Sequence, residues 1–264
     1  MAVRYGLSEW QKYQPRNDDN APIVLCFGDS WFWYPIPGVG NLSSRFLEFG
    51  RYQAIDFVSI GKNGMEIAFP GKGILSDLTT FLQWESKTLD MIIVSGGGND
   101  FAGADDLGPL LKKGNASDAA SWFRVKQTDA LFNNIAQGYQ RVIYLRDTFC
   151  PEVPIVSHCY DYAQASGKGL LWFSPWLKPS FEQIGMPQNL HADAVKFIID
   201  QLAKQQSALI GTRYHFVDTR GLLGRHDWCN ELHPTAEGFN KIARPFYPVL
   251  EKYFPDWVRK PKWY

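Results

Sequence analysis

The sequence predicts an α/β fold, a three-layer α/β/α sandwich in which a parallel sheet is covered by helices on both faces. Two observations predict it. Short runs rich in apolar residues alternate along the chain with longer runs that have the periodicity of helices. The short runs are almost continuously apolar, as is typical of parallel strands buried on both faces. We find no internal repeat, linker or low-complexity segment, so residues 1–264 are expected to form one domain.

Five segments have the character of buried strands. The first is residues 23–28 (IVLCFG), and the others are residues 54–61, 91–100, 154–158 and 214–218. The third of them ends in a glycine-rich turn. In a parallel sheet the carboxyl ends of all strands lie at one edge, and ligands bind there. The residues that follow each strand are therefore the candidates for function.

Five longer segments have helical periodicity. They are residues 41–50, 74–87, about 119–146, 191–211 and 235–254, the last of them expected to bend near Pro245 and Pro248. Within the third, the run RVIYL fits a strand as well as a helix. Residues 1–20 are expected to be an N-terminal extension. Residues 160–190 are irregular and rich in aromatic side chains, and form either a lid or substrate loop or a small satellite core.

The charge balance argues against nucleic acid as a partner. The chain has 27 Lys and Arg and 27 Asp and Glu, so its formal net charge is zero and no basic face is implied. Aromatic residues make up 15% of the chain, with 10 Trp, which is more than packing usually requires. Some of these rings are expected to line a cleft.

The cysteines and the N-terminus favour a reduced, cytoplasmic protein. The first 20 residues contain no apolar signal-like region, and no run approaches the 18 apolar residues of a membrane span. The cysteines Cys26, Cys150, Cys159 and Cys229 form no CxxC pair. A Cys150–Cys159 disulfide and export without a cleavable signal remain open alternatives.

Polar or glycine-rich residues follow the first three predicted strands. Ser30 follows the first, in GDSWFWYPIPG; the run GKNG, residues 61–64, follows the second; Asn99 lies in GGND after the third. A serine hydroxyl becomes a nucleophile when a base takes its proton, and the resulting oxyanion needs hydrogen-bond donors. The backbone N–H of Gly64, with Gly61 as a competitor, and the amide of Asn99 are the candidate donors.

The best candidate for the base is His233. It lies in the loop DWCNELHPT, after the last predicted strand and just before a helix. Of the other histidines, His191 lies at a predicted helix start and His215 inside a strand, so both are expected to be structural. Ser30 and His233 therefore form the candidate nucleophile and base.

Four short motifs together resemble the SGNH (GDSL-type) hydrolase family. They are GDS at residues 28–30, Gly64, GGND at residues 97–100 and the pair His233–Pro234, and they occur in the family's order over nearly the whole chain. The GxSxG motif of ordinary α/β-hydrolases is absent. The resemblance implies a flavodoxin-like α/β/α fold with a five-stranded parallel sheet.

The resemblance also implies a serine esterase or acylhydrolase that needs no metal or organic cofactor. Ser30 would be the nucleophile and His233 the base. The oxyanion would be bound by the N–H groups of Ser30 and Gly64 and by the side chain of Asn99. Asp29 would hold the turn without taking part in the chemistry.

The sequence departs from the family at two positions. Trp31 replaces the leucine of GDSL, which is a common variation. Asn230 stands three residues before His233, where the family has an aspartate. Asn can orient an imidazole but cannot stabilise its cation by charge. We expect Asn230 to hold the position, with Asp227 as the alternative acid; Glu231 as that acid, or a Ser–His dyad, are further alternatives.

The substrate is expected to be a small-molecule, lipid or sugar ester. Trp31 and Trp33 are predicted to form a pocket wall, and His158, with Tyr160, either touches substrate or packs beneath the sheet edge. A metal site of His158, Cys159 and Cys150 matches no compact zinc pattern. The alternative function is a non-catalytic or weakly active binding module for acylated glycans or lipids, motivated by the missing aspartate at position 230.

Overall fold

A computed structural model describes residues 3–13, 21–34, 40–50, 55–102, 104–170, 175–209 and 213–264. Within these residues six parallel strands form one sheet, in the order β1-β3-β2-β4-β5-β6. The strands are β1 (Arg4–Tyr5), β2 (Ile23–Gly28), β3 (Asp56–Gly61), β4 (Leu89–Ser95), β5 (Ile155–His158) and β6 (Tyr214–Val217). The predicted α/β fold with a parallel sheet is confirmed.

The predicted number of five strands is wrong by one. The additional strand, β1, lies within the segment predicted as an N-terminal extension and pairs with β3, with Arg4 opposite Val58. A strand of two residues is too short to show the apolar run or the alternation by which strands are recognised in a sequence. The strand is formed by its pairing with β3 at the edge of the sheet, and no local sequence pattern indicates it.

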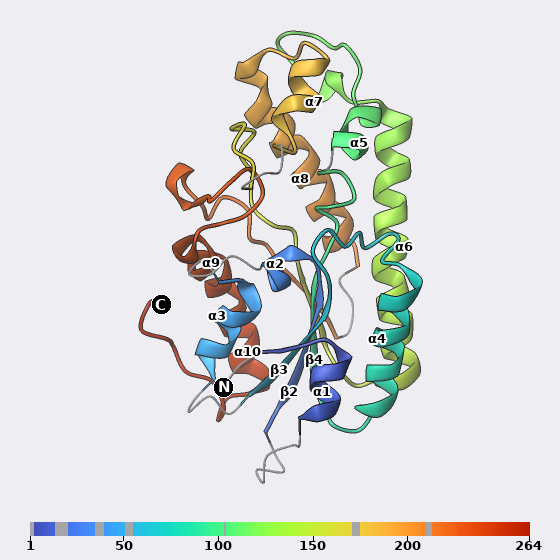
Figure 1. Ribbon diagram of the computed structural model, residues 1–264, viewed down its shortest axis with the longest axis vertical. Helices are drawn as coiled ribbons and strands as arrows, with labels where there is room; N and C mark the ends of the chain where they lie inside the picture. Colours follow the sequence, from blue (N-terminus) through green and yellow to red (C-terminus); the bar gives the residue numbers. More distant parts are fainter. Residues whose placement is uncertain are drawn as a thin grey trace.

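Helices cover both faces of the sheet (Figure 1). One layer contains α4 (Lys72–Trp84), α6 (Val125–Phe149) and α8 (His191–Ser207), and the other contains α2 (Ser30–Trp33), α3 (Leu42–Phe49), α9 (Ala236–Ala243) and α10 (Tyr247–Tyr253). The short helices α5 (Ala104–Leu107) and α7 (Lys178–Gln183) contact each other at the top of the view. Helix α1 (Leu7–Lys12) follows β1.

Two of the predicted helices are each divided by a short 3₁₀ turn. In one the turn lies at the start of the segment, and in the other it contains a proline. The segment predicted as 119–146 is a 3₁₀ turn, Ala119–Trp122, followed by α6, which includes RVIYL. The segment predicted as 235–254 is divided into α9 and α10 by a 3₁₀ turn, Arg244–Phe246. Pro245 lies at this division, because proline has no N–H to donate to the preceding turn.

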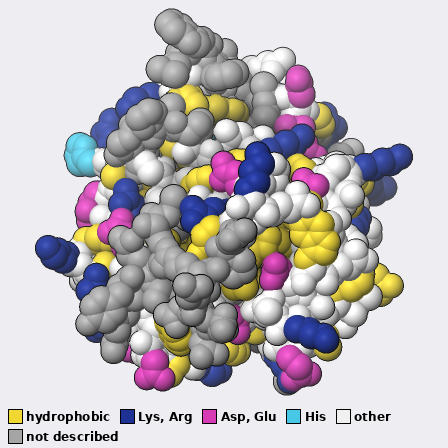
Figure 2. All heavy atoms as spheres, turned by 60° about the horizontal axis from the view of Figure 1, so that its bottom comes forward, with side chains coloured by type: hydrophobic (Ala, Val, Ile, Leu, Met, Phe, Trp, Pro, Cys, Tyr) yellow, Lys and Arg dark blue, Asp and Glu magenta, His cyan; other side chains and the backbone are white. Residues whose placement is uncertain are grey.

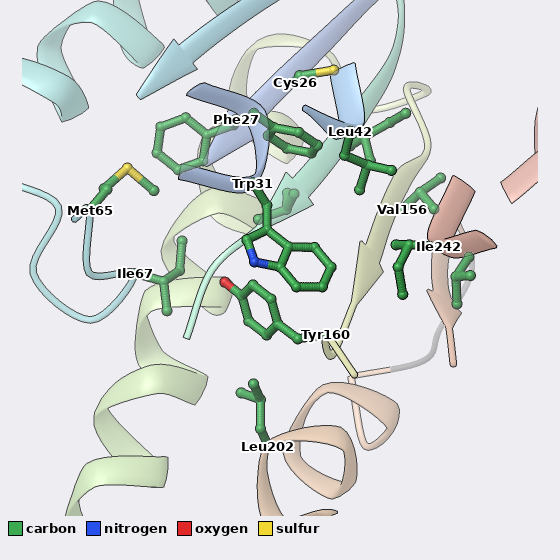
Figure 3. Close-up of a cluster of buried hydrophobic side chains, with 14 of the residues drawn as sticks. Cys26, Phe27, Trp31, Leu42, Met65, Ile67, Val156, Tyr160, Leu202 and Ile242 are labelled. Carbon is green, nitrogen blue, oxygen red and sulfur yellow. The ribbon is translucent and has the colours of Figure 1, made fainter. Parts of the chain in front are cut away.

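The apolar side chains of the central strands and the inner helix faces form one core. The four inner residues of β2, from Val24 to Phe27, are fully buried. Burial of Val24, Leu25 and Phe27 stabilises the fold by roughly 1.5–3 kcal/mol for each side chain. Figure 3 shows how this core continues from Phe27 to the rings of Trp31 and Tyr160, which lie beyond the carboxyl end of β2. The core therefore supports the sheet edge where the candidate residues lie.

The surface carries both signs of charge. On the face in Figure 2, Lys and Arg side chains are interspersed with Asp and Glu, in keeping with the zero net charge.

All four cysteines are free, so the possible Cys150–Cys159 disulfide is not formed. In the described part of the chain no helix is long and apolar enough to cross a membrane.

Candidate active site

Ser30 is the first residue of α2 and lies at the carboxyl edge of the sheet. Strand β2 ends at Gly28, where a Cβ would come within 2.3 Å of the Ser95 carbonyl oxygen of β4, so only glycine fits. Asp29 then caps α2, and its carboxylate accepts a hydrogen bond of 3.0 Å from the Trp31 N–H. The tight approach and the cap together set the position of Ser30.

The hydroxyl of Ser30 is hydrogen-bonded to a histidine. Ser30 Oγ lies 2.9 Å from Nε2 of His233, which comes from the loop between β6 and α9. That distance is within the range in which a base can take the proton of a hydroxyl. The structure thus brings together the two residues that the sequence analysis paired.

Asn230 lies behind the histidine and orients it. Its Oδ1 is 3.1 Å from Nδ1 of His233 and also accepts the backbone N–H groups of Leu232 and His233, each at 2.9 Å. Its Nδ2 donates to the hydroxyl of Tyr34 at 3.1 Å. These contacts direct the amide oxygen to the imidazole. Nδ1 therefore carries the proton, and the lone pair of Nε2 faces Ser30.

The two acidic alternatives for this position are occupied elsewhere. The carboxylate of Asp227 forms an ion pair of 2.7 Å with Lys241 and accepts the Gly224 N–H. The buried carboxylate of Glu231 accepts N–H groups of Gly167, Trp176, Leu177 and Lys178. Neither carboxylate is bonded to His233. The group that contacts the imidazole behind Ser30 is therefore the neutral amide of Asn230.

The imidazole of His233 is enclosed by aromatic rings. Tyr34 stacks on it with ring centroids 4.1 Å apart and planes at 16°, and Trp176 meets it edge-on at 5.9 Å. This burial lowers the pKa of His233 to about 3. Near neutral pH the ring is therefore uncharged, as a general base must be before it takes a proton.

A buried carboxylate below Ser30 holds the candidate oxyanion donor. Asp29 Oδ2 accepts hydrogen bonds from Asn99 Nδ2 at 3.2 Å and from the Tyr160 hydroxyl at 2.5 Å, and Oδ1 accepts the Ser95 hydroxyl. Burial raises the pKa of Asp29 to about 6, against the lowering effect of these bonds. Asp29 therefore links the nucleophile turn to Asn99.

Tyr160 is held in an unusual backbone conformation. Its φ is +66°, a left-handed value that is uncommon for a bulky residue and costs about 1–3 kcal/mol. In this conformation its ring meets Trp31 edge-on at 4.8 Å (Figure 3). A Cβ on Gly98 would come within 3.1 Å of the same ring. Tyr160 thus packs against both the nucleophile turn and the turn that carries Asn99.

The turn that contains Gly64 is fixed beside Ser30 from both ends. Lys62 N–H donates to the Gly28 carbonyl at 3.3 Å, and Asn99 Nδ2 donates to the Met65 carbonyl at 3.3 Å. Gly64 has φ +72°, and its N–H has no hydrogen-bond partner among the described residues. Gly61 allows β3 to approach β2 closely, because a Cβ on it would come within 1.8 Å of the Gly28 carbonyl oxygen.

An apolar pocket opens beside Ser30. It encloses about 560 Å³ of space between atoms, counted with its open mouth. Trp31, Asn99 and Tyr160 line it together with Ser30, and most of its remaining wall is made of aliphatic and aromatic side chains. A bound ester carbonyl at Ser30 would therefore have an apolar space next to it.

Two of the predicted substrate-contacting residues are placed differently. Trp31 lines the pocket, as expected. Trp33 instead packs on Tyr5 with ring centroids 5.0 Å apart, and it is not part of the pocket wall. His158 is 0% exposed and stacks beneath Trp31 at 5.4 Å, so it supports the wall and cannot touch a substrate. Substrate contact is therefore corrected for both residues: Trp33 packs on Tyr5, and His158 packs beneath the sheet edge, which was the alternative expected for it.

His158 and the cysteines form no metal site. Nδ1 of His158 accepts the Tyr160 N–H at 3.2 Å, and burial lowers the pKa of this imidazole to about 3. Over the residues for which the structure gives positions, no group of three His, Cys, Asp or Glu side chains is arranged to hold a metal ion. His158 is thus a neutral packing residue in this structure.

Structural comparison finds the same fold in known lipases and esterases. An extracellular lipase from Streptomyces rimosus aligns with a TM-score of 0.52 and 16% identity, covering 88% of this chain and 100% of its own. A lipase from a goat rumen metagenome gives 0.55 and 14%, covering 86% and 97%. The M. smegmatis aryl esterase gives 0.52 and 16%, covering 89% and 100%. The chain therefore shares the fold of these lipases and of this esterase.

Comparison of the sequence itself adds no relative. No protein-family model matches the chain, and no curated protein matches it. At 14–16% identity the structural likeness establishes the fold, while the chemistry has to be argued from the residues of this chain.

Proposed function

We propose that this protein is a serine esterase that cleaves carboxylic esters through an acyl-enzyme. The observation that carries the proposal is the row of hydrogen bonds from Ser30 to His233 to Asn230, at 2.9 and 3.1 Å. Such a row turns a weak hydroxyl into a nucleophile, because the oriented imidazole takes its proton. The esterases and lipases that share the fold support the same class of reaction.

The reaction takes place in two halves. Ser30 Oγ attacks the ester carbonyl carbon while its proton passes to Nε2 of His233. The tetrahedral intermediate then loses the alcohol, which leaves with that proton, and the acyl group stays on Ser30. Water attacks the acyl-enzyme, gives its proton to His233 and releases the acid, and the proton returns to Ser30.

The oxyanion would be bound by three donors at the strand ends. The N–H of Ser30 is at the N-terminus of α2, and the N–H of Gly64 has no other partner in the described chain. Asn99 Nδ2 makes two long bonds, at 3.2 and 3.3 Å, to Asp29 and Met65. Bonds of this kind tighten or re-form when the reacting oxygen arrives.

The kinetic test compares Ser30→Ala with the wild type on p-nitrophenyl acetate. We expect kcat/KM to fall by about 10⁴ or more, because the acyl-enzyme can no longer form. Ser8→Ala, at an exposed position of α1, is the matched control and should keep full activity. Equal activity of Ser30→Ala would refute the assignment. A wild type without turnover would favour the binding module for acylated glycans or lipids.

A further inference from the structure

We propose that the pocket beside Ser30 holds the acyl chain of the substrate, and that the enzyme prefers esters of apolar acids longer than acetate. This inference rests on the proposed function. The pocket extends from Ser30 between α5, α7 and α8, which lie together at one end of the molecule (Figure 1). Phe101, Leu107, Phe181 and Ile198 are among the buried side chains that form this part of the wall.

The wall offers an apolar surface and few groups that could bind hydroxyls. No Lys, Arg, Glu or His side chain lines the pocket. The two carboxylates that do are already occupied: Asp29 as described above, and Asp161 by the N–H groups of Gly221 and Leu223 at 2.6 Å. Away from Ser30 and Asn99, the Nε1 of Trp228 is the one side-chain donor of the wall that has no partner among the described residues. A sugar ring placed here would therefore leave most of its hydroxyls without partners, whereas an alkyl chain needs none.

The chemistry of deacylation assigns this pocket to the acyl side. After the alcohol leaves, a water molecule must take its place beside Nε2 of His233 in order to be activated. An ordered water needs two to four polar partners, which the apolar wall does not supply. We therefore assign the alcohol to the solvent side, and the apolar pocket suits the part of the substrate that stays attached to Ser30.

The size of the expected preference follows from the burial of methylene groups. Each methylene moved from water into an apolar pocket favours the bound transition state by about fourfold. We therefore expect kcat/KM to rise along the series p-nitrophenyl acetate, butyrate and hexanoate, by about tenfold or more over the whole series.

A larger side chain in the pocket wall tests whether this pocket causes the preference for longer acyl chains. Ala163 lies in the loop after β5, lines the pocket and is only partly buried, so Ala163→Phe should reduce the space in the pocket. Ala165→Phe makes the same change two residues further along the same loop, outside the pocket wall. The ratio of hexanoate to acetate kcat/KM should fall by about tenfold in the first variant and stay at the wild-type value in the second. Thermal unfolding of both variants checks that they are folded.

The outcomes separate this inference from the proposed function. A ratio that falls only in Ala163→Phe supports the acyl pocket. Acetate cleaved as well as hexanoate by the wild type, or equal ratios in the two variants, would overturn the pocket assignment while leaving Ser30 as nucleophile. If Ser30→Ala is as active as the wild type on acetate, the proposed function itself fails.

Discussion

Asn230 decides how well His233 can act as a base. In serine triads, replacing the aspartate by asparagine costs about 10⁴ in kcat because the histidine is held in the wrong tautomer. Here the backbone N–H groups of Leu232 and His233 hold the amide oxygen toward Nδ1, and Tyr34 accepts from the amide nitrogen. The tautomer is thus the productive one, and only the stabilising charge is missing.

The first prediction restores that charge with Asn230→Asp. A carboxylate 3.1 Å from Nδ1 favours the protonated imidazole, so the pKa of His233 should rise from its low value of about 3. Because the base must be unprotonated, the acid limb of kcat/KM should move to higher pH, and the maximal rate should rise by roughly tenfold. A pH profile with a soluble ester measures both.

Asp227→Asn is the control for this profile. Asp227 contacts Lys241 and the Gly224 N–H, so its neutralisation should leave the acid limb where it is in the wild type. An acid limb that moves in Asp227→Asn and stays in Asn230→Asp would mean that the wrong residue has been placed behind the histidine.

The sequence indicates site residues that follow a strand or lie in a motif, and it does not indicate the contacts that support them. Ser30, Asn99 and His233 stand next to strand ends or in a recognisable motif, so the strand-end rule indicates them. Tyr160, two residues after β5, was indicated in the same way, as a residue that touches substrate or packs beneath the sheet edge, but its hydrogen bond to Asp29 was not. Tyr34 acts by stacking on His233 and by its hydroxyl, which no spacing in the sequence reveals.

At the scale of elements, one carboxylate organises the segment that follows β5. Glu231 is fully buried and accepts four backbone N–H groups, from Gly167 and from residues 176–178. This segment supplies part of the pocket wall, including Leu177, and carries Trp176 to the edge of His233. The expectation of a lid or substrate loop in residues 160–190 stays a prediction, and Glu231 shows how the described part of it is attached.

The second prediction tests this attachment with Glu231→Gln. The amide has no negative charge, and its NH₂ group faces backbone N–H groups that need an acceptor. The free energy of unfolding should therefore fall by about 2–4 kcal/mol. Urea denaturation measures the change. Glu182→Gln on α7 is the control, since its side chain is 59% exposed and pairs with Lys178 at 3.5 Å, a contact that contributes little. Equal loss of stability in both variants would contradict the role given to Glu231.

Elements with an apolar run or several turns of helical periodicity could be predicted from the sequence, and β1 and the shortest helices could not. Strands β2 to β6 and helices α3, α4, α6 and α8 show clear apolar runs or helical periodicity. Strand β1 has only two residues, and helices α2, α5 and α7 have four to six, which is too short to show a helical period. Contacts with distant parts of the chain form them. Three of these, α2, α5 and α7, contribute to the pocket, and only the part of its wall formed by Trp31 of α2 was indicated by the sequence.

At the scale of the whole molecule, strand order explains why three separate motifs meet. The turns that carry Ser30, Gly64 and Asn99 follow β2, β3 and β4, and the sheet order places β3 and β4 on either side of β2. Parallel pairing puts all three turns at the same edge. His233 comes from the far end of the sheet, after β6, and only its long loop brings it to Ser30.

Side-chain direction is what the sequence leaves undetermined at this scale. Trp31 and Trp33 are two residues apart in one aromatic run, yet one lines the pocket and the other packs on Tyr5. The difference arises because the run forms the single turn α2, in which neighbouring side chains point in different directions. Of the two rings expected in the pocket wall, the structure therefore places only Trp31 beside the pocket, and its contact with substrate stays a prediction.

The most direct test of the central claim is covalent labelling with a fluorophosphonate, followed by intact mass and peptide mapping. We predict one adduct per chain on Ser30, no adduct in Ser30→Ala, and labelling slowed by about 100-fold or more in His233→Ala, because the base that activates the hydroxyl is gone. No adduct on the wild type, or an adduct on a residue other than Ser30, would contradict the account.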